Sequence, residues 1–164
     1  MTRISLLLAL AAIAALLALA LMPLRAAASS TLPASWVELG GKRFGVELAL
    51  DNESRARGLM HRAYMADDHG MLFVHDYTEP LGYWMKNTLL SLDILYFDEN
   101  RRLVTQQLDV PPCRSRSNDC PVYPSSEPAR YVLELNAGVA RALNLQKGDQ
   151  LVFGPGIPPR GRGN

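Results

Sequence analysis

The sequence predicts a mainly β fold: one compact antiparallel β-barrel or sandwich domain with two short helices. Between residues 36 and 153, about seven short runs alternate apolar with polar residues or are rich in β-branched and aromatic residues. Gly, Pro, Asn and Asp residues separate these runs, as turns require. Helical patterns are few and short, and the sequence has no internal repeat and no regular alternation of strands with long helices. An antiparallel sheet is therefore expected.

The first elements expected are a hairpin and a short helix. The segment 36–50, WVELGGKRFGVELAL, alternates on both sides of two glycines at 40–41, which can both take the positive φ of a tight hairpin turn. Asp51 or Asn52 can then cap a helix of about two turns, which Gly58 ends.

Five further strands are expected at 71–75, 92–98, 102–110, 129–136 and 151–153. The sequence TEPLG predicts a turn or loop after the first of them. The stretch from Pro111 to Pro128 predicts a long loop, because proline cannot donate a hydrogen bond within a sheet. Asn136 is expected to cap a second short helix, whose apolar residues fall on one side.

The two ends of the chain are expected to lie outside the domain. Residues 1–28 match a secretory signal, with a positive residue before an uncharged run from Ile4 to Leu24 and an Ala-x-Ala cleavage site. An uncleaved membrane anchor is the alternative, because roughly 20 apolar residues are enough to cross a bilayer. Residues 29–35 are expected to form a linker before the domain at 36–153. The Gly- and Pro-rich residues 154–164 predict a disordered tail.

Export makes a disulfide the expected state of the two cysteines, Cys113 and Cys120. The predicted location is periplasmic or secreted, or the inner membrane if residues 4–24 stay as an anchor, and disulfides persist in such oxidising compartments. The bridge would close an eight-residue loop and add about 2.5 kcal/mol of stability. A metal site with two cysteine ligands is the alternative, but no histidine lies near them in the sequence.

Composition narrows the classes of function. The 17 Lys and Arg residues and 16 Asp and Glu residues are interspersed, so the chain has no basic stripe for nucleic acid and no polybasic membrane patch. The motifs of serine hydrolases, zinc proteases, P-loop proteins and dinucleotide-binding proteins do not occur. We therefore expect no nucleic-acid partner and no cofactor.

A copper site is the metal hypothesis that the sequence raises, because imidazoles and soft thioethers gather in one region. Each methionine, however, stands among apolar residues, as a space-filling core side chain would. We expect no bound metal ion. The residues in question are His61, His69, His75, Met60, Met65, Met71 and Met85.

A polar triplet interrupts two core-forming segments. Lys86, Asn87 and Thr88 lie between Trp84-Met85 and a strongly apolar run. Three such groups either cap a turn or face a pocket. We expect them to face a pocket, with Trp84 as an apolar or stacking wall.

Cationic residues flank the end of the first predicted helix. Arg55, Arg57 and Arg62 flank the GLM sequence on both sides and are candidates to bind an anion together with Lys86. The simpler interpretation is a solvated helix face, on which Glu53 and Arg57 form an i,i+4 pair worth a few tenths of a kcal/mol.

Asp93 is an acid within a very apolar strand, SLDILYF. It either lies at the exposed start of the strand or needs a partner, because burying an unpaired carboxylate is costly. Lys86 is the nearest cation across the predicted turn, and a Lys86–Asp93 pair would make both residues functional candidates.

The chain resembles the exported bacterial and archaeal family DUF192, a domain of unknown function, through five motifs in order: RGLMHR, GMLFVH, YWMKNTLLSLDILYFDENRRLV, PVYPSSEPARYVLELNAG and KGDQLVF. The resemblance covers roughly residues 36–153. Tyr83 stands where the family often has Phe, and the segment between the cysteines is longer than usual. The resemblance implies a compact β-rich domain and no particular reaction. The family's motif positions include Arg57, Gly58, Met60, Arg62, Trp84, Lys86, Asn87, Thr88, Asp93, Tyr123 and Glu134.

The function expected is that of an exported cell-envelope module that binds a small polar or anionic ligand or serves as an accessory protein. One alternative is a protein–protein interaction or structural module without a small-molecule site, whose partner would be an envelope protein. The other is an envelope hydrolase or transferase that uses Asp93 and Lys86 as acid–base partners. The predicted ligand-binding residues are Arg57, Arg62, Trp84, Lys86, Asn87, Thr88 and Asp93.

Overall fold

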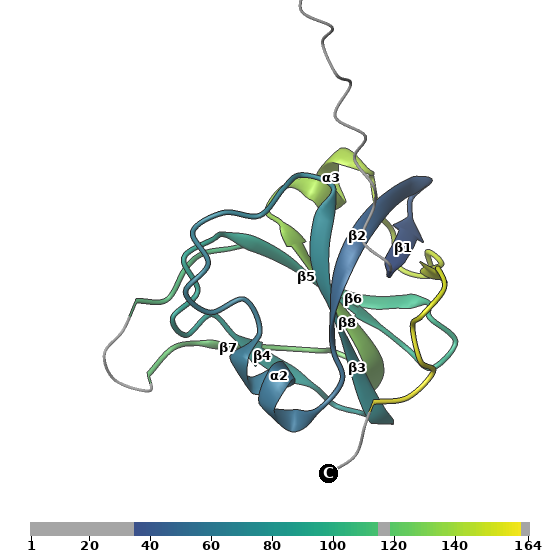
Figure 1. The fold of residues 1–164 in the computed structure, drawn as a ribbon, viewed down its shortest axis with the longest axis horizontal. Helices are drawn as coiled ribbons and strands as arrows, with labels where there is room; N and C mark the ends of the chain where they lie inside the picture. Colours follow the sequence, from purple (N-terminus) through teal and green to yellow (C-terminus); the bar gives the residue numbers. More distant parts are fainter. Residues whose placement is uncertain (1–34, 115–118, 162–164) are drawn as a thin grey trace, which may run out of the picture. The chain divides into compact units, whose positions relative to one another are not determined.

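The computed structural model describes residues 35–114 and 119–161, and Figure 1 shows the course of the chain. Two short helices are present in this part, α2 (Asn52–Arg57) and α3 (Val139–Ala142). The predicted signal and all but the last residue of the predicted linker lie outside the described residues. Within the described ranges, no helix has the length and apolar character needed to cross a membrane. The strands are β1 (Trp36–Leu39), β2 (Lys42–Ala49), β3 (His69–Glu79), β4 (Gly82–Trp84), β5 (Leu92–Phe97), β6 (Leu103–Val110), β7 (Val122–Pro124), β8 (Ala129–Asn136) and β9 (Val152–Phe153).

Seven of these strands form one curled sheet in the order β6-β5-β8-β3-β2-β1-β9, and β4 and β7 form a separate two-stranded ribbon. The sheet curls into a half-barrel, and backbone hydrogen bonds from Leu103 to Asp149 (2.9 Å) and from Leu151 to Arg101 (2.9 Å) join its two ends. The prediction of a mainly β domain with two short helices is confirmed. The sheet is mixed rather than wholly antiparallel, because β2 and β3, which α2 connects in the chain, pair in parallel.

Both faces of the sheet are covered, so its central strands are mostly apolar and are buried on both sides. All six residues of β5 are buried. Along β8, Leu133 and Leu135 pack in the core on one face of the sheet, whereas Val132 packs in the core on the other face, which α2 and the β4–β7 ribbon adjoin. Because side chains alternate along a strand, Glu134 points to the same face as Val132.

The predicted hairpin and first helix are confirmed. Gly40 and Gly41 have φ of 58° and 75°, which are the two positive values of a tight hairpin turn between β1 and β2. Helix α2 follows Asp51 and ends at Gly58.

The structure differs from the expected elements in three strands. β3 runs from His69 to Glu79 rather than from 71 to 75. β4 lies next to the predicted TEPLG turn, and β7 lies inside the predicted long loop. These two strands have three residues each, which is too short for an alternating pattern. Pro124 is tolerated because both strands of a two-stranded ribbon are edge strands.

The predicted cap of α3 is wrong. The helix begins after Gly138, whose φ is 87°, and no side chain caps it. The Asn136 amide instead donates to the backbone oxygens of Met65 (3.0 Å) and Ala66 (3.4 Å). Asn136 therefore holds the loop before β3 against the end of β8.

Residues 154–161 follow a defined path, which differs from the disordered tail expected there. The Gly154 N–H donates to the Trp36 oxygen at 2.8 Å, and the Tyr131 hydroxyl donates to the Pro159 oxygen at 2.9 Å. Ile157 packs against the core. These contacts use backbone groups and one apolar side chain, which a Gly- and Pro-rich composition does not reveal.

Candidate functional site

Helix α2 owes its start to a capping box. The Ser54 N–H donates to the Asp51 carboxylate at 2.7 Å, and the Asp51 N–H donates to the Ser54 hydroxyl at 3.1 Å. The backbone and side-chain hydrogen bonds from Ser54 lower the pKa of the Asp51 carboxyl. Gly58 ends the helix with φ 47° and ψ −135°, a conformation that favours glycine. The chain is thereby turned sharply at the point where Arg57 leaves the helix.

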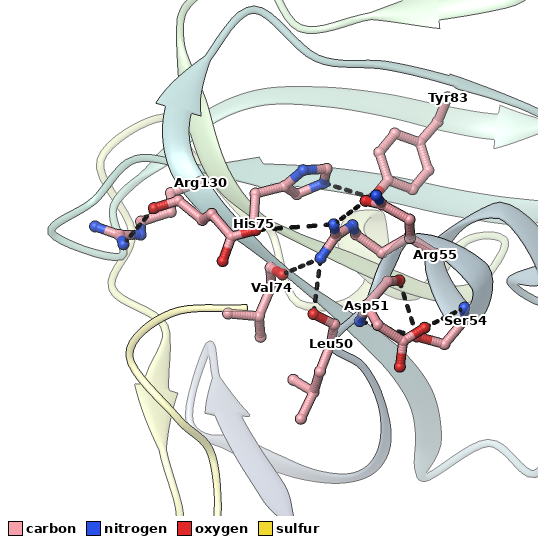
Figure 2. Close-up of polar contacts among 10 residues, drawn as sticks. Leu50, Asp51, Ser54, Arg55, Val74, His75, Tyr83 and Arg130 are labelled. Atoms are coloured by element: carbon pink, nitrogen blue, oxygen red, sulfur yellow. Dashed lines mark hydrogen bonds and ion pairs between the residues drawn. The ribbon is translucent and has the colours of Figure 1, made fainter. Parts of the chain in front are cut away.

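Arg55 attaches this short helix to the sheet (Figure 2). Its Nη1 donates to the backbone oxygens of Leu50 at 2.8 Å and Val74 at 3.0 Å, and its Nη2 lies 4.0 Å from the Asp76 carboxylate. The side chain is only 13% exposed, so these contacts satisfy most of its donors away from water. Arg55 is therefore the residue that fixes the position of α2.

The polar triplet at 86–88 divides into a turn residue and two residues that line a cavity. Asn87 has φ 56°, which asparagine tolerates better than most residues. Its N–H donates to the Cys113 oxygen at 3.1 Å, and its oxygen accepts from the His61 N–H at 2.8 Å. Lys86 and Thr88, on either side, line the cavity described below.

A disulfide joins Cys113 to Cys120, as predicted, with 6.0 Å between the Cα atoms. Cys113 also donates its N–H to the Met85 oxygen at 3.2 Å, beside the triplet. Cys120 comes just before β7, which pairs with β4. The disulfide therefore ties together two segments that both contact residues 82–87.

A small cavity of about 30 Å³ lies between α2, the β4 segment and the sheet. Residues from four separate parts of the chain surround it, and three of them, Arg55, Arg57 and Lys86, are cations. The Lys86 ammonium lies 5.2 Å from the centre of the Trp84 ring, in a cation–π contact. The lining residues are Arg55, Ala56, Arg57, Gly58, Leu59, Met60, Phe73, Tyr83, Trp84, Lys86, Thr88 and Glu134.

Two larger hollows adjoin this central cavity by sharing lining residues with it. The Arg62 hollow, about 350 Å³, shares Arg57, Gly58 and Met60 with the cavity. Its other lining residues are Glu47, Leu48, Ala49, Ser54, Arg62 and Met71. The His75 hollow, about 310 Å³, shares Arg55, Ala56, Tyr83 and Trp84 with the cavity and adds His75 and Gly82.

The structure brings four of the seven predicted ligand-binding residues to the central cavity. Arg57, Trp84, Lys86 and Thr88 line it, although they come from two distant segments. Arg57 also forms a solvated pair with Glu53 at 3.7 Å, as the simpler interpretation expected. The other three predicted residues, Arg62, Asn87 and Asp93, lie elsewhere.

Arg62 lines the neighbouring hollow, where both of its terminal nitrogens bond the Glu47 carboxylate. This hydrogen bond is the main reason that the pKa of the Arg62 guanidinium is raised. Arg57 is also paired, with Glu53, but at 3.7 Å between two exposed side chains. Because the Glu47 pair is closer and made through both terminal nitrogens, Arg62 offers less attraction to an anion than Arg57 does.

Asp93 is fully buried and lines none of these three hollows. Its two carboxylate oxygens accept from the N–H groups of Asp109 and Ala140, each at 2.9 Å. The expectation of an exposed acid at the strand's start is wrong, and the partners are backbone groups rather than Lys86. The acid–base pairing of Lys86 with Asp93 gains no support from this geometry.

Glu134 is the acid among the residues that line the cavity, and it was not among the predicted ligand-binding residues. It is 4% exposed, and burial raises the pKa of its carboxyl to about 8. Its sequence signal was the same as that of Asp93, an acid inside an apolar strand, YVLELN. An acid inside an apolar strand therefore marks Glu134 as a candidate by the same rule that marked Asp93.

The aromatic wall of the cavity is held by one side-chain hydrogen bond. The Tyr83 hydroxyl lies 3.0 Å from His75 Nε2 (Figure 2), and the Tyr83 ring packs edge-on against Phe73 and Tyr96. Burial, and then the nearby Glu134, raise the pKa values of the Tyr83 and Tyr96 hydroxyls. Burial, and then the Arg55 charge, lower the pKa of His75 to about 4. At neutral pH these three rings are uncharged.

These features define a class of protein: a half-barrel β domain in which a capped short helix and a disulfide-tied segment enclose a small cavity with a cationic rim. The chain belongs to the DUF192 family, described as "Uncharacterized ACR", whose model matches residues 35–153. No curated protein is similar enough to the chain to count as a relative.

Two solved structures are similar to the chain. A "putative transcription regulator" from Sinorhizobium meliloti 1021 is 38% identical, with a TM-score of 0.64 over 73% of this chain and 91% of that one. A protein of unknown function from Novosphingobium aromaticivorans DSM 12444 is 30% identical, with a TM-score of 0.63 over 71% of this chain and 81% of that one. Both similarities extend over most of the domain.

Proposed function

We propose that the protein is an exported cell-envelope module that binds a small anionic ligand in the groove between α2 and residues 83–88. The observation that carries the proposal is the convergence of Arg57 and Lys86, from distant segments, on one cavity. Two cations that line one recess attract an anion more strongly than either would alone on an open surface. A guanidinium can bond two oxygens of the anion at once, and an ammonium adds a compact charge.

The remaining lining residues suit a small ligand. Thr88 is 5% exposed and adds a hydroxyl that can donate or accept, and the half-exposed Trp84 ring adds an apolar wall. The central cavity takes a group of only one or two heavy atoms. The rest of a ligand would occupy the adjoining Arg62 hollow of about 350 Å³.

The proposal of export is supported by the signal-like residues 1–28 and is compatible with the disulfide. A mass spectrum of the protein recovered from its own cell envelope tests this. A mass matching residues 29–164 less two hydrogens is expected, and a full-length reduced chain would contradict it.

Ligand binding is tested with small anions of known charge: inorganic phosphate, acetate and glucuronate at constant ionic strength. Amide chemical shifts around Gly58 and Lys86 would report binding. We expect Arg57→Ala and Lys86→Ala each to weaken the affinity about tenfold, which is the loss of about 1.4 kcal/mol. Retained affinity in both variants would refute the proposal.

Two matched variants control for general loss of positive charge. Arg43 and Lys147 are exposed cations in ion pairs with Glu38 and Glu127, and neither lines the groove. Arg43→Ala and Lys147→Ala should bind the same anions as the unaltered protein.

A second candidate function, contact with an envelope protein, is favoured by one observation. Trp84 and Val122 lie directly opposite each other on the β4–β7 ribbon and are 40% and 60% exposed. Paired exposed apolar side chains are typical of contact surfaces. Val122→Thr separates the two functions, because it should weaken a protein contact and leave anion binding unchanged.

A further inference from the structure

Glu134 is a buried acid to which the structure gives no hydrogen-bonding partner. Its neighbours across the sheet are Met71 and Ile94, both apolar. Its carboxyl lines the central cavity, and no residue in the ranges 35–114 and 119–161 makes a hydrogen bond with it. Buried polar groups in proteins are almost always bonded. An acid that is 4% exposed and directed into a cavity therefore points to a group that enters the cavity.

The groups that face Glu134 come from every element around it. α2 contributes Arg55 and Arg57, β4 contributes Tyr83, β5 contributes Tyr96, and Lys86 follows β4. β3 contributes no titratable side chain to the cavity wall, but its His75 bonds the Tyr83 hydroxyl.

The two tyrosine hydroxyls already have partners. The Tyr83 hydroxyl lies against His75, and the Tyr96 hydroxyl donates to the Tyr123 oxygen at 2.5 Å. Neither of them is therefore the natural partner of Glu134, which leaves an incoming ligand atom as the candidate.

We propose that Glu134, as a neutral carboxylic acid, is the deep hydrogen-bond donor of this site and that the ligand is an oxyanion, a carboxylate or a phosphate monoester, whose other oxygens face Arg57 and Lys86. This inference rests on the proposed function above. A cavity of about 30 Å³ has room for one such oxygen, since a site of roughly 10–15 Å³ already holds a water molecule.

Charge decides between an oxyanion and the opposite ligand, an ammonium group bound to ionised Glu134. Three cations, Arg55, Arg57 and Lys86, line the same cavity and would oppose a fourth positive charge. They stabilise an anion, and a neutral acid adds a hydrogen-bond donor without a repelling charge. Burial keeps the Glu134 carboxyl in this donating form at neutral pH, as it does for buried carboxylic acids in other proteins.

The two ligand types predict opposite responses to pH. Burial raises the pKa of Glu134 to about 8, whereas that of His75 is about 4 and those of Tyr83 and Tyr96 are raised above their ordinary 10. Above pH 8 the acid becomes a carboxylate, which repels an oxyanion and attracts an ammonium group. Oxyanion affinity should then fall with rising pH, and ammonium affinity should rise.

The experiment measures the affinity of acetate and of methylammonium at pH 6, 7 and 9 by amide chemical shifts at constant ionic strength. Acetate affinity should be equal at pH 6 and 7 and fall about tenfold from pH 7 to 9, given the titration of one group near pH 8. In Glu134→Gln the amide still donates a hydrogen bond, so acetate should bind at all three pH values with one affinity. The affinity of methyl phosphate, compared with that of acetate at pH 7, then distinguishes the two oxyanion classes.

Two further variants complete the test. Glu134→Leu fills the same space without a donor and should lose acetate binding at every pH while its melting curve shows a folded protein. Glu38→Gln, at a partly exposed acid that does not line the cavity, should keep the pH response of the unaltered protein.

Three results would overturn the inference. They are a flat acetate profile in the unaltered protein, the same tenfold fall in Glu134→Gln, or methylammonium that binds more tightly than acetate at pH 7. If acetate binding depends on Arg57 and Lys86 but not on Glu134, the proposed function stands and this inference fails. If no anion binds at any pH, both fail.

Discussion

The Asp93 carboxylate, inside strand β5, accepts a hydrogen bond from the backbone N–H of Ala140, in the first turn of helix α3, at 2.9 Å. Its other oxygen accepts from the Asp109 N–H on β6, also at 2.9 Å. One buried side chain thus joins three elements. Asp109 has φ 52°, so the carboxylate also holds a backbone conformation that costs energy.

Removal of this carboxylate should destabilise the fold. Asp93→Ala leaves two backbone N–H groups without their acceptor, and we expect a loss of about 3 kcal/mol in the free energy of unfolding. Asp93→Asn keeps one acceptor oxygen and should lose about half as much. Urea denaturation at pH 7 measures both, with the exposed Asp67→Ala as a control that should stay within about 0.5 kcal/mol. A small loss in Asp93→Ala would contradict this role.

Gly58 should tolerate alanine poorly. Its φ of 47° with ψ of −135° is unfavourable for other residues, whereas a Cβ there would meet the Phe73 ring only at 3.4 Å, an ordinary contact distance. We expect Gly58→Ala to cost about 1–3 kcal/mol. Gly138→Ala is the matched control, because Gly138 also has positive φ but lies in the left-handed helical region, with φ 87° and ψ −10°. Equal urea midpoints in the two variants would show that the conformation of Gly58 is no more costly for alanine than that of Gly138.

The disulfide should stabilise the folded state by a modest amount. The double variant Cys113→Ser, Cys120→Ser is expected to lose at most about 2.5 kcal/mol, because the bridge closes a short loop. Dithiothreitol should lower the urea midpoint of the unaltered protein and leave that of the double variant unchanged. A response of the double variant to the reductant would mean that the effect does not come from this bridge.

Glu134 should make the protein less stable as the pH rises. The pKa of its carboxyl is about 8 in the folded state and about 4.5 in the unfolded state, so the folded state binds more protons between these values. The free energy of unfolding therefore falls from pH 4.5 to 8, by at most about 1.4 kcal/mol per pH unit. Relative to the unaltered protein, Glu134→Gln should gain about 2 kcal/mol between pH 6 and pH 8. Parallel curves for the two proteins would exclude this effect.

His75 should act in the opposite direction on the acid side. Its pKa is lowered from 6.5 to about 4 in the folded state, so the unfolded state binds the proton first as the pH falls. The contribution of His75 to the free energy of unfolding is fully present above pH 6.5 and is lost as the pH falls toward 4. We expect a loss of about 1–2 kcal/mol, after allowance for the partial exposure of the side chain. The imidazole proton resonances of His75 give its pKa directly, and a midpoint near 6.5 would contradict the prediction.

Local sequence signals predicted the elements that depend on neighbouring residues. The Gly40-Gly41 pair determines its own turn, and Asp51 and Gly58 bound α2 through bonds within a few positions. β4 and β7 could not be predicted in this way, because three residues make a strand only when a distant partner is present. The parallel pairing of β2 with β3 likewise depends on the position of α2, which Arg55 fixes through contacts with β3.

The site was predicted in part for a similar reason. Lys86 and Thr88 are polar residues next to an apolar run, and this contrast is visible in the sequence. Whether a buried acid has a partner depends on which backbone groups reach it. Asp93 meets two N–H groups from distant elements, whereas Glu134 faces a cavity, although the two acids look alike in their strands.

The attachment of residues 85–88 has a consequence for how the family can diversify. Main-chain atoms hold this segment: Asn87 bonds Cys113 and His61, and Thr88 and Cys113 both donate to the Met85 oxygen. Exchange of the side chains at positions 86 and 88 therefore leaves the backbone frame intact. Single substitutions at these two positions can therefore change the charge and shape of the rim without refolding the segment.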